Sequence, residues 1–147
     1  MRLSKEDGQS AGVADATMND DQFMVVPAIS PVEFARNHYR LRRARDKLFP
    51  TGYFSDPGWE IMLELYLCEC DNLELSPSYL GYAAAIPPTT TLRYVAQLEQ
   101  DGYIERTPCN KDRRRTITRL TEAGRKAMVS IMTDGAGRLY EDLLRQK

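Results

Sequence analysis

Three pairs of a capping residue and a proline divide this chain into helical segments: Ser30-Pro31, Asp56-Pro57 and Ser76-Pro77. In each pair a short polar side chain can accept a hydrogen bond from an unpaired amide of the first helical turn, and the fixed backbone angle of proline suits that turn. Glu33, three residues after Ser30, can complete a capping box. The pairs predict a helix from Ser30 to about Phe49, a second from Asp56, and a short third after Ser76.

The spacing of apolar residues then changes from a helical period to an alternating one. Ile86-Pro87-Pro88 ends the third helix, because a residue before proline avoids helical geometry. A fourth helix follows, with Thr91, Tyr94, Val95 and Leu98 on its inner side, and Gly102 stops it. Residues 103–107 and 116–120 alternate as strands, joined by a basic, turn-rich loop. The order predicts a mainly α fold with a small β-hairpin (α+β).

A last helix is expected from Thr121, and two glycines interrupt its apolar stripe. The stripe consists of Met128, Ile131, Met132, Leu139, Leu143 and Leu144. Gly135 and Gly137 each cost up to ~1 kcal/mol relative to alanine inside a helix. They predict a bend or break near residues 135–137.

The first two predicted helices each have two distinct faces. In the first, a basic row lies opposite an apolar line; the row is Arg36, Arg40, Arg43 and Lys47, and the line is Phe34, Leu41, Ala44 and Leu48. In the second, Glu60, Glu64 and Glu69 are expected outside, opposite Trp59, Met62, Leu63, Tyr66 and Leu67. The stripes of the first and last helices have little monomer core left to cover, so these helices are expected to form a dimer interface.

Length and composition fit one domain preceded by a tail. The 147 residues are 42% hydrophobic and 28% charged. They contain neither an apolar stretch of the ~20 residues needed to cross a bilayer nor a secretory signal. We therefore expect a cytoplasmic protein without membrane association. Residues 1–29 are predicted to be a flexible acidic tail. Whether Phe23 to Val26 pack on the domain as an extended segment is not decided by the sequence. Residues 30–147 form the domain, with flanking dimerisation helices at 30–50 and 121–147.

Charge is unevenly distributed although the net charge is only -1. Residues 51–85 contain six acidic residues and no Lys or Arg, whereas residues 86–126 contain nine basic and five acidic residues. Residues 31–50 are also basic, with six basic and two acidic residues. This pattern predicts a directional electrostatic field and is compatible with an anionic partner.

Three motifs follow one another from the fourth helix to the last one. They are L-E-x-D-G-Y-I-E-R at residues 98–106, D-R-R at 112–114 and L-T-E-A-G at 120–124. In this order they resemble the multiple-antibiotic-resistance (MarR) family of winged helix-turn-helix regulators, over roughly residues 57–130. The resemblance implies a homodimeric transcription regulator that binds an inverted-repeat operator in double-stranded DNA. It places the recognition helix in the major groove and the basic wing in the minor groove.

The candidate DNA-binding residues lie on the recognition helix and in the wing: Thr89, Thr90, Arg93, Gln97, Lys111, Asp112, Arg113, Arg114 and Arg115. Arg93 can contact guanine or phosphate, and the threonines suit phosphates or a thymine methyl. Asp112 is close enough in sequence to hold an arginine side chain in position. The family pattern sends the second arginine of D-R-R, here Arg114, into the minor groove. Pro87-Pro88 and Leu92 depart from that pattern, so no base preference carries over.

Other reactive residues favour structural roles. Cys68 and Cys70 are roughly 200° apart on a helix and cannot chelate one metal. Cys109 is expected to be an incidental thiol, with an exposed redox-responsive thiol as the alternative, and His38 is expected to be packed or at an interface. We expect no enzyme activity, cofactor or metal, and a small-molecule effector is left open. The alternative function is a winged-helix protein-interaction adaptor without sequence-specific DNA binding.

Overall fold

The computed structural model describes residues 28–49 and 53–146. These residues form five helices and one hairpin, in the order α1 (Pro31–Leu48), α2 (Pro57–Cys70), α3 (Pro77–Ala83), α4 (Pro88–Gln100), β1 (Ile104–Pro108), β2 (Thr116–Leu120) and α5 (Glu122–Arg145). The predicted mainly α fold with a β-hairpin is confirmed. The tail expected at residues 1–29, with its Phe23 to Val26 segment, falls outside the described residues except for Ala28 and Ile29.

The helices begin where the capping residues predict. Ser30 Oγ accepts a hydrogen bond from the Glu33 amide at 3.1 Å, and the Glu33 carboxylate accepts one from the Ser30 amide at 3.1 Å. Asp56 and Ser76 cap α2 and α3 in the same way through their side chains. At the end of α4, Gly102 adopts a φ of 78°, the left-handed conformation that glycine accepts without strain.

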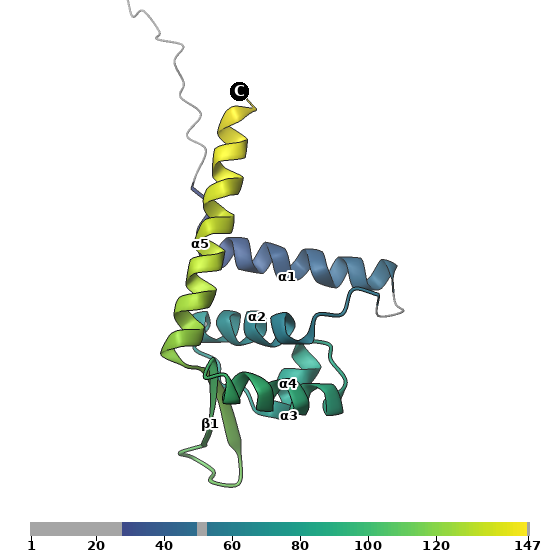
Figure 1. The fold of residues 1–147 in the computed structure, drawn as a ribbon, viewed down its shortest axis with the longest axis vertical. Coiled ribbons are helices and arrows are strands. Elements are labelled where there is room, and N and C mark those ends of the chain that lie inside the picture. The colour runs from purple at the N-terminus through teal and green to yellow at the C-terminus, as the bar shows by residue number, and fades with distance from the viewer. Residues whose placement is uncertain (1–27, 50–52, 147) are drawn as a thin grey trace, which may run out of the picture.

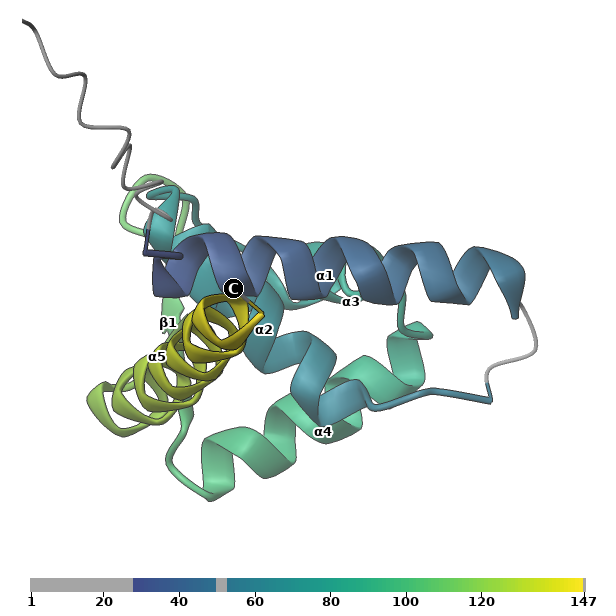
Figure 2. The same cartoon turned by 90° about the horizontal axis from the view of Figure 1, so that it is seen from above.

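The elements are arranged along the long helix α5, as Figure 1 shows. Helix α1 meets α5 partway along its length, and α2 lies between α1 and the end that contains α3, α4 and the hairpin. Figure 2 shows α1 extending across the molecule from α5 when viewed from above. Helix α2 supplies the centre of the core, where Ile61 and Leu63 are fully buried. The free end of α5 therefore points away from the helix-turn-helix.

The hairpin is antiparallel and is attached to the helical body at its base. Its register pairs Ile104 with Leu120 and Pro108 with Thr116. The Thr118 amide of β2 donates a 2.8 Å hydrogen bond to the Leu75 carbonyl, which lies between α2 and α3. This bond fixes the central residue of β2 to the helical body, while the connecting loop extends beyond it.

The break, one of the two alternatives predicted near residues 135–137, is wrong, because α5 continues as one helix from Glu122 to Arg145. Gly135 lies directly against the ring of Phe34 on α1, so that a β-carbon at this position would overlap the ring. Gly137 has open space around its α-carbon. Close packing of two helices, rather than a helix break, accounts for Gly135.

Alanine substitutions at these glycines are expected to act in opposite directions. Gly135→Ala must displace Phe34 and is expected to lower the free energy of unfolding by about 1–3 kcal/mol, the usual cost of overpacking. Gly137→Ala adds helix propensity without a clash and is expected to raise the free energy of unfolding by up to about 1 kcal/mol. Urea unfolding of both variants tests this pair, and equal shifts of the midpoint would contradict it.

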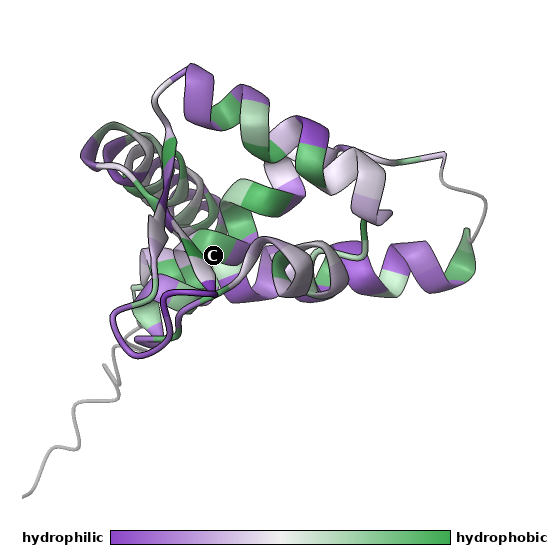
Figure 3. Cartoon of the chain, turned by 90° about the horizontal axis from the view of Figure 1, so that it is seen from below, coloured by the Kyte–Doolittle hydropathy of each residue, from purple (hydrophilic) through white to green (hydrophobic). Residues whose placement is uncertain are grey.

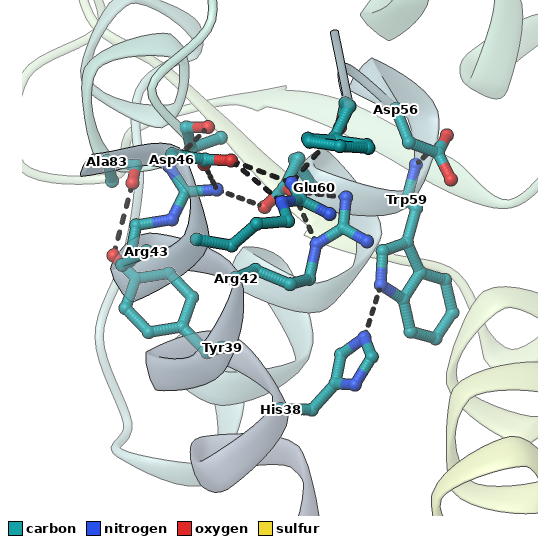
Figure 4. Close-up of polar contacts among 12 residues, drawn as sticks. His38, Tyr39, Arg42, Arg43, Asp46, Asp56, Trp59, Glu60 and Ala83 are labelled. Carbon is teal, nitrogen blue, oxygen red and sulfur yellow. Dashed lines mark hydrogen bonds and ion pairs between the residues drawn. The ribbon is translucent and has the colours of Figure 1, made fainter. Parts of the chain in front are cut away.

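The predicted outer position of Glu60 is also wrong. Glu60 is 6% exposed and receives hydrogen bonds from two residues of α1, from Arg42 Nε at 2.6 Å and from Arg43 Nη2 at 2.6 Å. Figure 4 shows the three side chains converging between α1 and α2. Arg43 therefore does not belong to the outer basic row predicted for the first helix. We call Arg42, Arg43 and Glu60 the buried ion cluster.

The buried ion cluster also contacts the helix-turn-helix. Arg43 Nη1 donates to the Ala84 carbonyl at 3.2 Å, at the end of α3. The hydroxyl of Tyr39, one turn earlier on α1, donates to the neighbouring Ala83 carbonyl at 3.3 Å. Helix α1 is thereby bonded to the turn that precedes α4.

Within the described ranges, no helix has the length and apolarity needed to cross a membrane.

Candidate nucleic-acid interface

The predicted residues of the fourth helix lie together on the outer side of α4. Thr89, Arg93 and Gln97 are exposed and Thr90 is partly buried. The opposite side contains the buried Thr91 and Val95, so the helix presents its polar residues outward. The guanidinium of Arg93 lies over the Tyr94 ring, 5.1 Å from its centroid, which is a cation–π contact. We call Thr89, Thr90, Arg93 and Gln97 the α4 outer face.

Packing against α3 fixes the orientation of α4. Thr91 Oγ1 donates a 3.0 Å hydrogen bond to the Pro87 carbonyl and lies against Gly81 of α3. A β-carbon at Gly81 would be 2.5 Å from that hydroxyl oxygen, so the two helices approach closely only because residue 81 is glycine. The α4 outer face is therefore held on a preformed helix pair.

The wing loop, residues 109–115, presents its four cations to solvent. Lys111, Arg113, Arg114 and Arg115 are all exposed. Among the described residues, no ion pair or side-chain hydrogen bond involves any of these four cationic groups. The loop contains these four cations and one carboxylate, that of Asp112, so it projects a net positive charge.

Asp112 holds the backbone of the wing loop rather than an arginine side chain. Its Oδ1 accepts a 3.0 Å hydrogen bond from the Arg114 amide, and its carbonyl accepts one from the Arg115 amide at 2.9 Å. The Arg115 carbonyl in turn accepts from the Cys109 amide at 2.8 Å. The expectation that Asp112 directly positions a guanidinium group is therefore wrong. Asp112 stabilises a turn of the backbone, and this turn determines where the side chain of Arg114 leaves the loop.

The α4 outer face and the wing loop belong to the same end of the molecule (Figure 1). Figure 3 looks at this end from below, and the wing loop shows the colour of hydrophilic residues. Arg106 of β1 donates to the Glu99 carboxylate of α4, with Nε to Oε2 at 2.9 Å, and this bond lowers the pKa of Glu99. The ion pair connects α4 to the hairpin beside it.

Cys68, Cys109 and His38 have structural surroundings, whereas Cys70 is exposed. Cys109 is 7% exposed, so the alternative of an exposed redox-responsive thiol is wrong. Burial, helped by Glu64, raises the pKa of Cys68 to about 12, and the thiol stays protonated. His38 Nε2 accepts a 3.2 Å hydrogen bond from the Trp59 indole, and burial lowers its pKa. Within the described residues, no three metal-ligating side chains come together.

Sequence reasoning missed the exposed aromatic residues of α3. Tyr79 and Tyr82 are 56% and 80% exposed, and their ring centroids lie 6.0 Å apart. Tyr82 lines a groove together with Leu92 of α4. The sequence contained a signal, since two tyrosines three residues apart occupy the same side of a short helix whose buried position is Leu80. The candidate interface therefore extends from α4 onto α3.

The fold is that of solved transcription regulators. The chain is 25% identical to transcriptional regulator PA4135, with a TM-score of 0.50 over 76% of this chain and 81% of that one. It is 18% identical to MepR of Staphylococcus aureus in a MepR–DNA complex, with a TM-score of 0.51 over 77% and 89% of the two chains. No protein-family model matches the sequence, and no curated protein matches it either. The structural likenesses confirm the predicted winged-helix fold, which these solved transcription regulators share.

Proposed function

We propose that this chain is a DNA-binding transcription regulator that binds an inverted-repeat operator as a homodimer. In this proposal α4 enters the major groove and the wing loop contacts the minor groove. The observation that carries it is the position of four exposed, unpaired cations of the wing loop at the same end as the α4 outer face. A helix fits the major groove, and an adjacent arginine suits the electronegative minor groove. The DNA complex of the structurally similar MepR supports the proposal.

The pairing of the acidic residues strengthens the electrostatic argument. Carboxylates from the acidic stretch at residues 51–85 bind arginines of other elements; the pairs are Glu60 with Arg42 and Arg43, Glu69 with Arg125, Asp71 with Arg36, and Glu74 with Arg119. The negative stretch is thus largely neutralised within the body. The wing loop and Arg93 keep their positive charge, which favours a polyanion at this end.

We propose α1 and α5, the segments 30–50 and 121–147, as the dimer interface. Leu41 and Leu48 are 69% and 76% exposed on α1, although leucine gains free energy by burial. On α5, Leu139 and Leu144 are 39% and 47% exposed. A two-fold dimer through these helices would present two α4 outer faces to half-sites about one helical turn apart.

We propose binding rather than catalysis as the activity, because the candidate residues are cations and hydroxyls on an open surface. The alternative, an adaptor that binds protein through the winged helix, uses the same exposed surface. Salt dependence distinguishes the two. Counterion release requires that the affinity for duplex DNA fall with salt, with a log–log slope of about -0.9 for each contacted phosphate.

The first test measures duplex binding and oligomeric state together. We expect the protein to bind a random-sequence duplex at low salt, to lose affinity steeply toward moderate salt, and to scatter light as a dimer. A variant with Arg113, Arg114 and Arg115 all changed to alanine serves as the control and is expected to show a shallower slope. Absent or salt-independent binding would contradict DNA recognition and favour the adaptor. A monomer at working concentration would contradict the dimer.

A further inference from the structure

We infer that the surface formed by α3 and α4 recognises thymine C5-methyl groups through Leu92. Tyr82 of α3 borders the same contact from the opposite side. The half-site accordingly contains at least one A·T pair whose thymine methyl group faces Leu92. This inference rests on the proposed DNA binding and specifies what the recognition helix contacts.

An exposed apolar groove runs between the two helices of the helix-turn-helix. Leu92 of α4 is 55% exposed and Tyr82 of α3 is 80% exposed. Both line the same groove, together with Pro77, Gly81 and Pro88. Leu92 lies one helical turn after Thr89 and so borders the α4 outer face. An apolar group in the major groove would meet Leu92 beside the hydroxyl of Thr89.

The groove is preformed rather than assembled on binding. The Ile86 amide donates a 2.8 Å hydrogen bond to the Gly81 carbonyl, which fixes the turn between the helices. Ile86 is 8% exposed and forms part of the groove floor. Leu92 and Tyr82 therefore stand on a fixed helix pair, so contacts through them need no rearrangement of the backbone.

The charges around the groove favour DNA as its occupant. Residues 75–98 contain no Asp or Glu, although the chain has 21 acidic residues, and Arg93 is their one basic residue. A phosphate backbone therefore meets no repulsion across α3 and the first half of α4. The unpaired cations of the wing loop lie at the same end of the molecule. A neutral apolar molecule would gain nothing from this charge pattern.

The same composition determines which bases suit the surface. Guanine is usually recognised in the major groove by Arg or Lys, and the α4 outer face offers Arg93 alone for this. The remaining exposed groups are methyls, hydroxyls, a carboxamide and the leucine side chain. Thymine is the base that presents a methyl group in the major groove. Apolar contact with thymine is therefore the base recognition that Leu92 can provide.

Removal of single methyl groups from the DNA tests this contact. The preferred duplex is first selected from a random pool, and each thymine of one half-site is then replaced by deoxyuridine. This change deletes the C5-methyl group and preserves base pairing. We expect one or two replacements to weaken binding about fourfold each, the usual effect of exposing one buried methyl. Replacements outside the half-site are expected to have no effect.

Protein variants assign the effect to Leu92. Leu92→Ala is expected to bind the thymine duplex severalfold more weakly than wild type and to respond no further to deoxyuridine. Leu73→Ala changes a leucine that is 60% exposed outside the groove, and it is expected to retain the wild-type response. Wild-type binding that is indifferent to every deoxyuridine would overturn the thymine contact while leaving DNA binding intact. A pool in which no duplex binds would overturn the proposed function itself.

Discussion

Glu60→Ala is expected to lower the free energy of unfolding by about 3–5 kcal/mol, the usual cost of removing one partner from a buried ion pair. The substitution leaves the guanidinium groups of Arg42 and Arg43 facing an empty site between α1 and α2. Their side chains are only 13% and 20% exposed, so water cannot fully replace the carboxylate. Urea unfolding followed by circular dichroism measures the change.

Glu69→Ala is the matched control on the same helix. Its carboxylate pairs with Arg125, but both side chains are more than a third exposed, and such pairs contribute about 0–1 kcal/mol. Glu60→Gln retains the shape and one acceptor, so its destabilisation should fall between those of the two alanine variants. Equal unfolding midpoints for Glu60→Ala and Glu69→Ala would show that the buried ion cluster does not stabilise the fold.

The buried ion cluster gives α1 a role in addition to the proposed dimer interface. Helix α1 is bonded through Arg43 and Tyr39 to the carbonyls of Ala84 and Ala83, which lie immediately before the turn to α4. In a dimer built on α1, these bonds would help to set the distance between the two recognition helices. Loss of Glu60 is therefore expected to reduce the selectivity for half-site spacing as well as stability.

The order of elements was predictable from the sequence because local chemistry determines it. Ser30, Asp56 and Thr121 cap helices through contacts within three residues, and Gly102 takes the backbone angle that ends α4. The inner side of α4 followed from its period, because only one side of this helix meets the core. Such features need no knowledge of distant residues.

The errors arose where a second element covers a surface. The apolar period of α2 indicates one inner face, but α1 packs on another side and buries Glu60. Helix propensity predicts a break at Gly135, yet the Phe34 ring requires a small residue there. Sequence spacing placed Asp112 near the arginines correctly, but it could not distinguish a bond to the Arg114 amide from one to a guanidinium.

Arg114→Ala is expected to weaken DNA binding by about 1.5–3 kcal/mol for each wing that contacts the duplex, the usual range for a hydrogen bond to a charged group. The loss should be largest where an A·T-rich segment narrows the minor groove beside the half-site, because that groove concentrates negative potential. Affinities for a selected duplex and for a scrambled one, measured at one salt concentration, test this. Unchanged affinity on both duplexes would exclude insertion of Arg114 into the groove.

Two further variants separate the contributions of wing geometry and base recognition. Asp112→Ala leaves every cation in place but removes the acceptor for the Arg114 amide, so it should cause a smaller loss of the same kind. Arg93→Ala is the contrasting variant on α4, and if Arg93 contacts a base it should lose affinity for the selected duplex and little for the scrambled one. An Asp112→Ala loss as large as that of Arg114→Ala would mean that the turn, rather than the guanidinium alone, controls the contact. Equal losses on both duplexes for Arg93→Ala would assign that residue to phosphate, leaving base recognition to its neighbours on α4.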